Sequence, residues 1–170
     1  MLSFDIRSLQ AQAAVVDAEL LATDDVWEEG DPTPVDAIYV TGRLSPAGPG
    51  VFYWHGRIDG RVNLDCSRCL APTQARVSDE THLIFAESGG PESDDPDVYK
   101  LADNAQEIDL RPAIREQWLL SAPSFALCRE DCKGFCPRCG ADLNNGPHDC
   151  SQQEVDPRWN PLRQLRESSN

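Results

Sequence analysis

The sequence predicts an α+β fold: a mainly antiparallel β-sheet or open barrel, one packed helix and a zinc-stapled C-terminal region. Two long segments on either side of Cys66 and Cys69 alternate apolar and polar residues, a later segment has helical spacing, and cysteines gather towards the C-terminus. With 170 residues the chain is long enough to bury a core. We divide it into a β-rich domain at 1–127, with a helix near 109–120, and a zinc-binding region at 128–170 packed on that domain.

The first fifty residues contain at least one strand. The mixed apolar spacing of residues 1–22 is typical of a short helix or of a strand, and the pattern does not separate the two. An acidic, proline-containing loop is expected at 23–34. Residues 35–44 carry the β-branched and aromatic side chains of a strand, and 45–50 are expected to form a loop.

The two alternating segments predict an antiparallel hairpin. From Phe52 to Cys66 every second residue is apolar or glycine and the residues between them are mostly polar, as in a half-buried strand. The odd positions from Ala75 to Phe85 repeat this alternation. The short segment CSRCLAP would connect the two strands. A tight turn at 59–60 is the alternative reading of the first segment.

A helix is predicted after a flexible acidic loop at 88–97. Leu110, Ile114 and Trp118 have the i, i+4, i+8 spacing of one helix face. Asp109 is a suitable N-cap because its carboxylate can accept an N–H of the first turn.

Flanking residues set the ends of the predicted helices. Ile108 is expected to staple the start of the helix to Ala113. Pro123 would end the helix because proline has no N–H to donate. A last helix is expected from Pro161, with Asn160 as its N-cap.

Seven cysteines and one histidine provide ligands for two metal ions. Seven thiols leave one unpaired, but with this histidine they make eight ligands, or two tetrahedral shells of four. Thiolate-rich sites select zinc or iron–sulfur, and we expect two zinc ions. Two closed shells leave no open position for a substrate, so we expect an interaction protein rather than an enzyme. The predicted ligands are Cys66, Cys69, Cys128, Cys132, Cys136, Cys139, His148 and Cys150.

The order of the ligands along the chain suggests two partitions between the sites. Two C-x2-C pairs are present, each of which can curl around one ion. The favoured partition gives site one Cys66, Cys69, Cys128 and Cys132, and site two Cys136, Cys139, His148 and Cys150. The alternative joins the four cysteines from 128 to 139 and leaves the first pair to the distant His148 and Cys150.

A redox function for the first C-x2-C motif is a further alternative. Such motifs lower a thiol pKa by opening a helix. Here the alternating pattern after the motif predicts a strand instead. His55 and His82 fall in the strand patterns and are expected to be ordinary surface or partly buried residues. No P-loop, nucleophile elbow or paired-carboxylate motif occurs, so no catalytic residue is assigned.

The charge of the chain limits its partners. Its net charge is -14, from 29 acidic against 15 basic residues. A generic nucleic-acid binder carries a basic field, so we expect no DNA binding. Direct RNA contact stays open, with Arg68, Arg138 and Arg158 as candidates, although these side chains can equally well only solvate their turns. The acidic excess suits docking on basic proteins such as ribosomal proteins.

The N-terminus and the hydropathy pattern predict a cytoplasmic protein. The first residues lack the basic start and apolar stretch of a signal peptide. No apolar run is long enough for a membrane span, so no membrane contact is expected. Thiols stay reduced in the cytoplasm, which favours metal binding over disulfides.

Four motifs occur in a specific order over about residues 60–165. They are CSRCL after a long strand, EIDLRPAIREQWLLSAP, CREDCKGFCPRCGADLN and DPRWNPL. Together they resemble the YceD family of large ribosomal RNA subunit accumulation proteins. The resemblance implies a cytosolic, non-enzymatic factor that acts with ribosome-assembly components in large-subunit biogenesis.

One departure from the family pattern concerns the last ligands. The family often ends in C-x-C, whereas this chain has His148-Asp149-Cys150. Histidine is a competent zinc ligand, so the site should survive. Two other functions remain as alternatives: a zinc-ribbon adaptor in another pathway such as transcription, and a redox or metal-handling protein.

Overall fold

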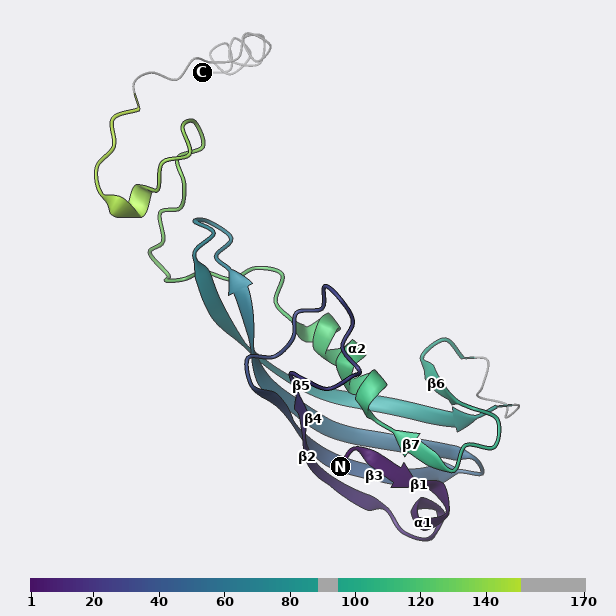
Figure 1. Ribbon diagram of the computed structural model, residues 1–170. Helices are drawn as coiled ribbons and strands as arrows, with labels where there is room; N and C mark the ends of the chain where they lie inside the picture. The colour runs from purple at the N-terminus through teal and green to yellow at the C-terminus, as the bar shows by residue number, and fades with distance from the viewer. Residues whose placement is uncertain (89–94, 151–170) are drawn as a thin grey trace, which may run out of the picture.

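A five-stranded sheet forms the body of the molecule (Figure 1). The computed structural model describes residues 1–88 and 95–150, and in it the strand order is β2-β3-β4-β5-β6. β2 to β5 are antiparallel to their neighbours, whereas β6 is parallel to β5. The sheet is therefore mixed and open, and the predicted α+β class is confirmed. The strands are β2 (Ala14–Leu21), β3 (Ala37–Gly48), β4 (Val51–Asp65), β5 (Pro72–Glu87) and β6 (Val98–Leu101).

A second, two-stranded sheet and two α-helices complete the body. β1 (Ser3–Asp5) pairs antiparallel with β7 (Glu107–Asp109). α1 (Ile6–Ala11) follows β1, and α2 (Arg111–Ser121) follows β7. Residues 1–22 thus contain both of the predicted alternatives, a short helix and a strand. A short 3-10 helix, η1 (Leu143–Asn145), lies in the cysteine-rich region.

β4 and β5 form a hairpin that extends beyond the rest of the sheet (Figure 1). They pair without interruption from Val51↔Ala86 to Asp65↔Pro72. The even-numbered residues of β4 from Phe52 to Val62 are buried, as the alternation predicts. Residues 59–60 continue the strand, so the alternative of a tight turn there is wrong.

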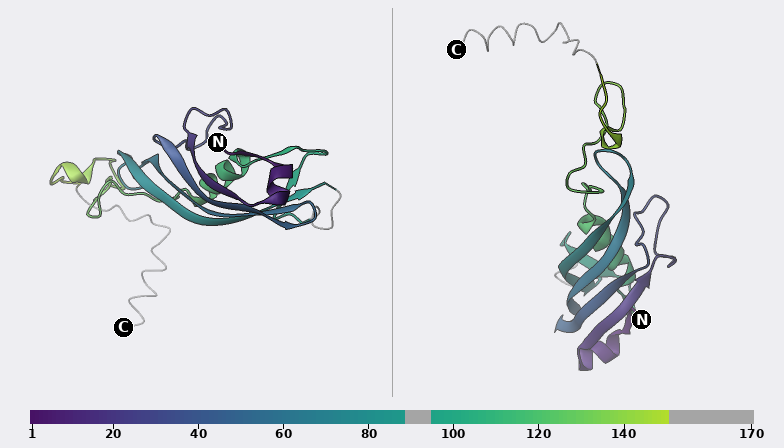
Figure 2. Two further views of the ribbon diagram at one scale, coloured as in Figure 1. Left: turned by 90° about the horizontal axis from the view of Figure 1, so that it is seen from below. Right: turned by 90° about the vertical axis from the view of Figure 1, so that its left-hand side faces the viewer.

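Helix α2 covers one face of the curved sheet (Figure 2). Its predicted apolar face is confirmed, because Leu110, Ile114 and Trp118 are all fully buried. Gly60 of β4 allows the close packing of Trp118, since a Cβ at Gly60 would lie 3.0 Å from the indole ring. Trp118 Nε1 also donates a hydrogen bond to the Pro32 carbonyl at 2.7 Å. The helix is thereby fixed on the sheet, and so is the start of the segment that follows it.

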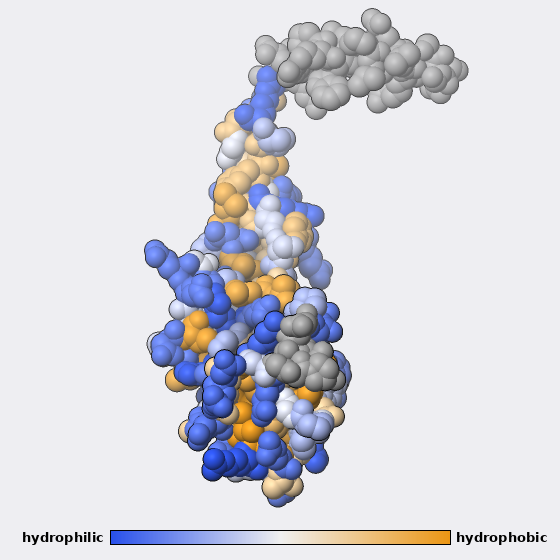
Figure 3. Space-filling model, turned by 90° about the vertical axis from the view of Figure 1, so that its right-hand side faces the viewer, coloured by the Kyte–Doolittle hydropathy of each residue, from blue (hydrophilic) through white to orange (hydrophobic). Residues whose placement is uncertain are grey.

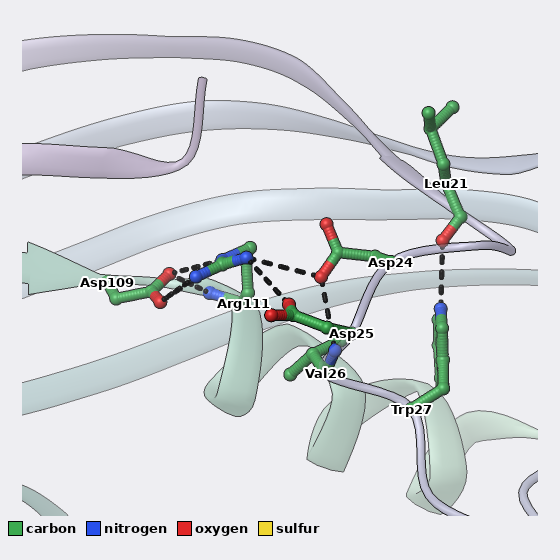
Figure 4. A network of polar contacts seen from close by, with 7 residues as sticks. All are labelled: Leu21, Asp24, Asp25, Val26, Trp27, Asp109 and Arg111. Carbon is green, nitrogen blue, oxygen red and sulfur yellow. Dashed lines mark hydrogen bonds and ion pairs between the residues drawn. The ribbon is translucent and has the colours of Figure 1, made fainter.

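The acidic loop between β2 and β3 is fastened to α2 by Arg111 (Figure 4). Its guanidinium lies 3.3 Å from Asp24, 3.1 Å from Asp25 and 2.8 Å from Asp109. The hydrogen bonds that Arg111 donates to the Asp109 carboxylate raise the pKa of Arg111, and the negative charges of Asp109, Asp24 and Asp25 raise it further. Ion pairs this exposed each stabilise a fold by at most about 1 kcal/mol. The network therefore mainly orients the loop and adds little to the stability of the fold.

The start of α2 differs from the prediction. Leu110 is the N-cap and Asp109 is the last residue of β7, because the N-terminal strand β1 pairs with this segment. Ile108 is fully buried opposite Phe4 of β1. The Asp109 carboxylate still accepts a hydrogen bond from the Arg111 N–H at 3.0 Å. It therefore bonds to the first residue of the helix although Asp109 is not the N-cap.

Further boundaries also differ. β3 continues through Gly48, past the predicted end at 44 and into the loop expected at 45–50, with an irregular register between Pro46 and Gly48. The short strands β6 and β7 were not predicted from the sequence. The helix expected from Pro161 lies outside the described residues, and the division into two domains stays a prediction.

Candidate metal centres

The tip of the β4–β5 hairpin is a tight turn that carries Cys66 and Cys69. The Leu70 N–H donates to the Cys66 carbonyl and the Cys66 N–H donates to the Ala71 carbonyl, both at 2.9 Å. Leu70 has a φ of 54°, in the left-handed region, where a residue with a Cβ is disfavoured by about 1–2 kcal/mol. The turn buries both thiols and leaves the Leu70 side chain exposed.

A second turn with the same hydrogen bonds carries Cys136 and Cys139. The Gly140 N–H donates to the Cys136 carbonyl at 3.0 Å, and the Cys136 N–H donates to the Ala141 carbonyl at 2.8 Å. Gly140 occupies the left-handed position, with a φ of 73°. Glycine adopts this conformation without a steric penalty, so this turn lacks the strain of the first.

Site one joins the hairpin tip to the segment after α2. Cys66 Sγ lies 3.8 Å from Cys132 Sγ, and Cys69 Sγ lies 3.6 Å from Cys128 Sγ. All four sulfurs lie within 4.8 Å of one another. Thiolates about 2.3 Å from a tetrahedral zinc ion are about 3.8 Å apart, so the observed spacing fits such an ion. The seven cysteines, all of which lie in the described part of the chain, form no disulfide.

Local contacts bring Cys128 to the hairpin. The Ser67 N–H donates to the Ala126 carbonyl at 2.8 Å, and the Ala126 N–H donates to Ser67 Oγ at 3.2 Å. Leu127 and Ala71 pack against the buried cysteines of site one. The chain leaving α2 is therefore held along the hairpin tip before it reaches its first cysteine.

Site two is formed within residues 136–150. The sulfurs of Cys136, Cys139 and Cys150 and a ring nitrogen of His148 lie within 4.8 Å of one another. Cys139 Sγ lies 3.2 Å from His148 Nε2. Cys136 is buried, whereas Cys139 and His148 are exposed, so this site is more open to solvent than site one. Three thiols and one imidazole are a donor set that suits zinc.

Backbone N–H groups favour a thiolate at one position of each site. The Cys128 N–H, with others from the turn, lowers the pKa of Cys66 to about 6. In site two the N–H groups of Cys139 and Arg138 lower the pKa of Cys136 to about 6. Burial, followed by the hydrogen bond with Cys69, raises the pKa of Cys128 to about 12. A bound cation would offset the repulsion between the thiolates of each site.

Asn144 connects the two sites. Although it belongs to η1 in the loop of site two, its Nδ2 lies 3.6 Å from Cys132 Sγ of site one. Its Oδ1 accepts the Lys133 N–H at 2.9 Å. Asp142 Oδ1 accepts from Asn144 Nδ2 at 2.7 Å and fixes the orientation of the amide. One side chain thus bonds to a ligand of one site and belongs to the loop of the other.

Arg68 and Gly134 make a second connection. Arg68 Nη1 donates to the Cys132 carbonyl at 2.7 Å, and the Phe135 N–H donates to the Arg68 carbonyl at 3.1 Å. A Cβ at Gly134 would lie 2.8 Å from the Arg68 carbonyl oxygen, and the φ of Gly134 is 72°. Both features require glycine where the two sites meet.

The structure groups the eight predicted ligands as the favoured partition does, and it does not form the alternative one. That they bind metal stays a prediction. β5 begins at Pro72, directly after the first motif, so this C-x2-C motif does not open a helix and the redox alternative lacks its usual geometry. Among the arginines considered for RNA contact, Arg68 has the structural contacts above, and Arg158 lies outside the described residues.

Sequence reasoning missed Asn144 and Gly134, because their contacts exist only once the two turns are placed side by side. It also treated His55 and His82 separately. They are exposed, as expected, but they lie directly opposite each other in the β4–β5 register. This pairing follows from the tip: once Asp65 is opposite Pro72, antiparallel counting places residue 55 opposite residue 82.

A family model described as Large ribosomal RNA subunit accumulation protein YceD matches residues 54–166, more than half of the chain. The chain belongs to the YceD family. The match includes α2 and both cysteine clusters, and it confirms the resemblance seen in the motifs.

Several curated relatives are similar to the chain. The Large ribosomal RNA subunit accumulation protein YCED homolog 1, chloroplastic, of Arabidopsis thaliana is 28% identical over 201 residues, which cover 98% of this chain and 58% of the relative. An uncharacterised protein of Mycobacterium tuberculosis is 36% identical over 104 residues, 59% of this chain and 49% of the relative. The uncharacterised protein YlbN of Bacillus subtilis is 30% identical over 109 residues, 64% of this chain and 62% of the relative.

The aligned regions span from 49% to 62% of the length of these relatives. No solved structure is significantly similar to the chain. Within residues 1–88 and 95–150, no helix has the length and apolar character needed to span a membrane.

Proposed function

We propose that this chain is a non-enzymatic factor that supports large ribosomal subunit biogenesis and the accumulation of large-subunit ribosomal RNA. The observation that carries the proposal is the alignment over 98% of the chain with a relative named for that accumulation. The family match at 54–166 supports it, since it includes both cysteine clusters.

Both clusters would hold zinc in closed structural shells. Site one would bind its ion through four cysteines, and site two through three cysteines and one histidine. Bound zinc would supply four-coordinate cross-links and neutralise thiolate charge. The residues themselves set the geometry: the two turns present the thiols, and Asn144 donates to one of them. With four protein ligands each, the sites would have no position for a reacting water.

The surface of the molecule supports docking on basic partners. A net charge of -14 attracts basic ribosomal proteins over a distance and repels the phosphates of RNA. Figure 3 shows hydrophobic residues at the surface of the narrow end of the molecule. Exposed apolar side chains near the metal centres in the sequence are Leu70, Phe125 and Phe135. Such side chains can add apolar contact to an encounter driven by charge.

A function in ribosome assembly would place this protein in the cytoplasm.

Deletion of the gene in its own host tests the proposal. The ratio of large-subunit to small-subunit ribosomal RNA, measured during rapid growth and in the cold, should fall, and the wild-type gene should restore it. Cys66→Ser should fail to restore it. Arg61→Ala, which removes an exposed ion pair with Asp36 and a long hydrogen bond to Gln74, should succeed. A normal ratio in the deletion strain would contradict the ribosomal function and favour the adaptor alternative.

A further inference from the structure

A third group of side chains of the types that can hold a metal ion lies on the solvent face of the β4–β5 hairpin. It consists of His55, Glu80 and His82, all of them exposed. Eleven residues of strand, or about 35 Å, separate His55 from Cys66 at the tip. The group is therefore independent of both cysteine sites.

The three side chains already converge. His55 Nε2 lies 2.8 Å from Glu80 Oε1. The rings of His55 and His82 are stacked, with centroids 4.4 Å apart and an angle of 5° between their planes. One ligand atom from each residue lies within 4.8 Å of the others. Donors bound at right angles about 2.1 Å from an ion are about 3.0 Å apart, so small side-chain rotations suffice to bring all three onto one ion.

Two neighbouring side chains, Tyr53 and Arg57, affect how these three residues would bind an ion. The Tyr53 hydroxyl is 2.5 Å from His82 Nδ1, which leaves Nε2 of His82 for an ion. Histidine ligands in metal sites almost always bond their second nitrogen in this way. Arg57 lies opposite Glu80 in the register and opposes a bound cation. The net charge of -14 attracts cations to the protein and so opposes the repulsion from Arg57.

We propose that His55, Glu80 and His82 form an exchangeable site for a divalent transition-metal ion such as Zn²⁺ or Ni²⁺. Imidazole and carboxylate donors suit these ions. With only three protein ligands, the ion would keep positions for water or for a donor atom of another molecule. Its exchange would thus differ from that of the two closed cysteine shells, and the site does not depend on the proposed ribosomal function.

The test is a calorimetric titration of Ni²⁺ into protein without a histidine tag, isolated with its cysteine sites filled. We expect one further ion to bind. Paramagnetic broadening in NMR spectra should centre on 53–57 and 80–84. His82→Gln and Glu80→Gln should each weaken binding at least about tenfold, since loss of a mere outer-shell partner already costs about 10–100-fold. Arg57→Gln should strengthen it.

Arg76→Gln is the matched control, because Arg76 is an exposed residue of β5 that pairs with Asp59 away from the three ligands. It should leave Ni²⁺ affinity unchanged. The proposal is overturned if no further ion binds, if the His82 and Glu80 variants bind as well as wild type, or if the broadening centres on 128–150. Thermal melts of each variant, recorded without added Ni²⁺, check that the exposed substitutions leave the fold intact.

Discussion

The two cysteine sites share one turn geometry but connect different parts of the chain. Site one joins residues separated by 66 positions, such as Cys66 and Cys132, and three of its four cysteines are buried. Site two lies within fifteen residues, and Cys139 and His148 are exposed. Site one is therefore part of the tertiary structure, assembled on a hairpin and a docked helix, whereas site two is a local fold that depends on its own loop.

The largest expected effect is that of Cys66→Ser. It removes a fully buried predicted ligand of site one. Zinc binding contributes about 10–16 kcal/mol in finger peptides, so the loss of the shell should release the 126–135 segment from the hairpin tip. NMR spectra should show loss of dispersed shifts at 66–71 and 126–135, with β4 and β5 intact below the tip. Dispersed shifts at 126–135 in this variant would contradict the tertiary character of site one.

Cys150→Ala is the matched change in site two. It should unfold 136–150, because Leu143 is the chief large apolar residue there and burial alone does not order the loop. The shifts of 66–71 should persist. His55→Ala serves as a control that should affect neither region.

Trp118→Ala tests whether site one depends on the docked helix. Loss of a buried tryptophan typically costs about 3–5 kcal/mol of unfolding free energy. Here it also removes the bond to the Pro32 carbonyl and leaves space above Gly60. Denaturant unfolding should show that loss, and zinc release from site one should occur at lower denaturant than release from site two. Simultaneous release from both sites would show that the helix does not distinguish them.

Asn144→Ala probes the coupling between the sites. The variant loses the donor to Cys132 Sγ and the acceptor of the Lys133 N–H. The Asn144 side chain also bonds to Arg129 and Asp142, but these two bonds do not reach a thiol of site one. Loss of the bonds to Cys132 and Lys133 corresponds to about 1–2 kcal/mol, or roughly a tenfold loss in zinc affinity. Competition with a chromophoric chelator should show weaker binding at site one, although the residue belongs to the loop of site two. A change confined to site two would mean that the sites are independent.

The smallest expected effects are those of substitutions at the two left-handed turn positions, Leu70 and Gly140. Gly140→Leu should destabilise site two by about 1–2 kcal/mol, because it imposes on the second turn the strain that Leu70 has in the first. Leu70→Gly should change stability by less than about 1 kcal/mol, because relief of strain is offset by the greater freedom of glycine in the unfolded chain. Chelator competition on both variants measures the difference. Equal effects would show that the turns are not equivalent.

Periodicity predicted the parts of the fold in which one face is buried. The alternation from Phe52 to Cys66 and the helical spacing of Leu110 and Trp118 were read correctly, because each pattern records contact with a single core. The strands β1, β6 and β7 have three or four residues each, too few for a period to emerge. The N-cap at Asp109 was wrong for a related reason, since pairing with β1 depends on residues more than 100 positions away.

The candidate ligands were visible in the sequence because cysteine spacing reflects the geometry of a metal shell. Their grouping followed from chain order, which the structure reproduces. The contacts of Asn144 and of Gly134 were not visible, because polar and glycine residues in a loop have many possible partners. The pairing of His55 with His82 was accessible in principle, since the hairpin tip fixes the register of both strands.

The most direct measurement is the zinc content of protein purified without added metal and passed over a chelating resin that strips weakly held surface ions. Elemental analysis relative to sulfur should give a ratio near two zinc ions per chain, one for each four-ligand shell. A ratio near one, or none, would contradict the two-site structure and leave some of the eight ligands as ordinary thiols and an ordinary imidazole.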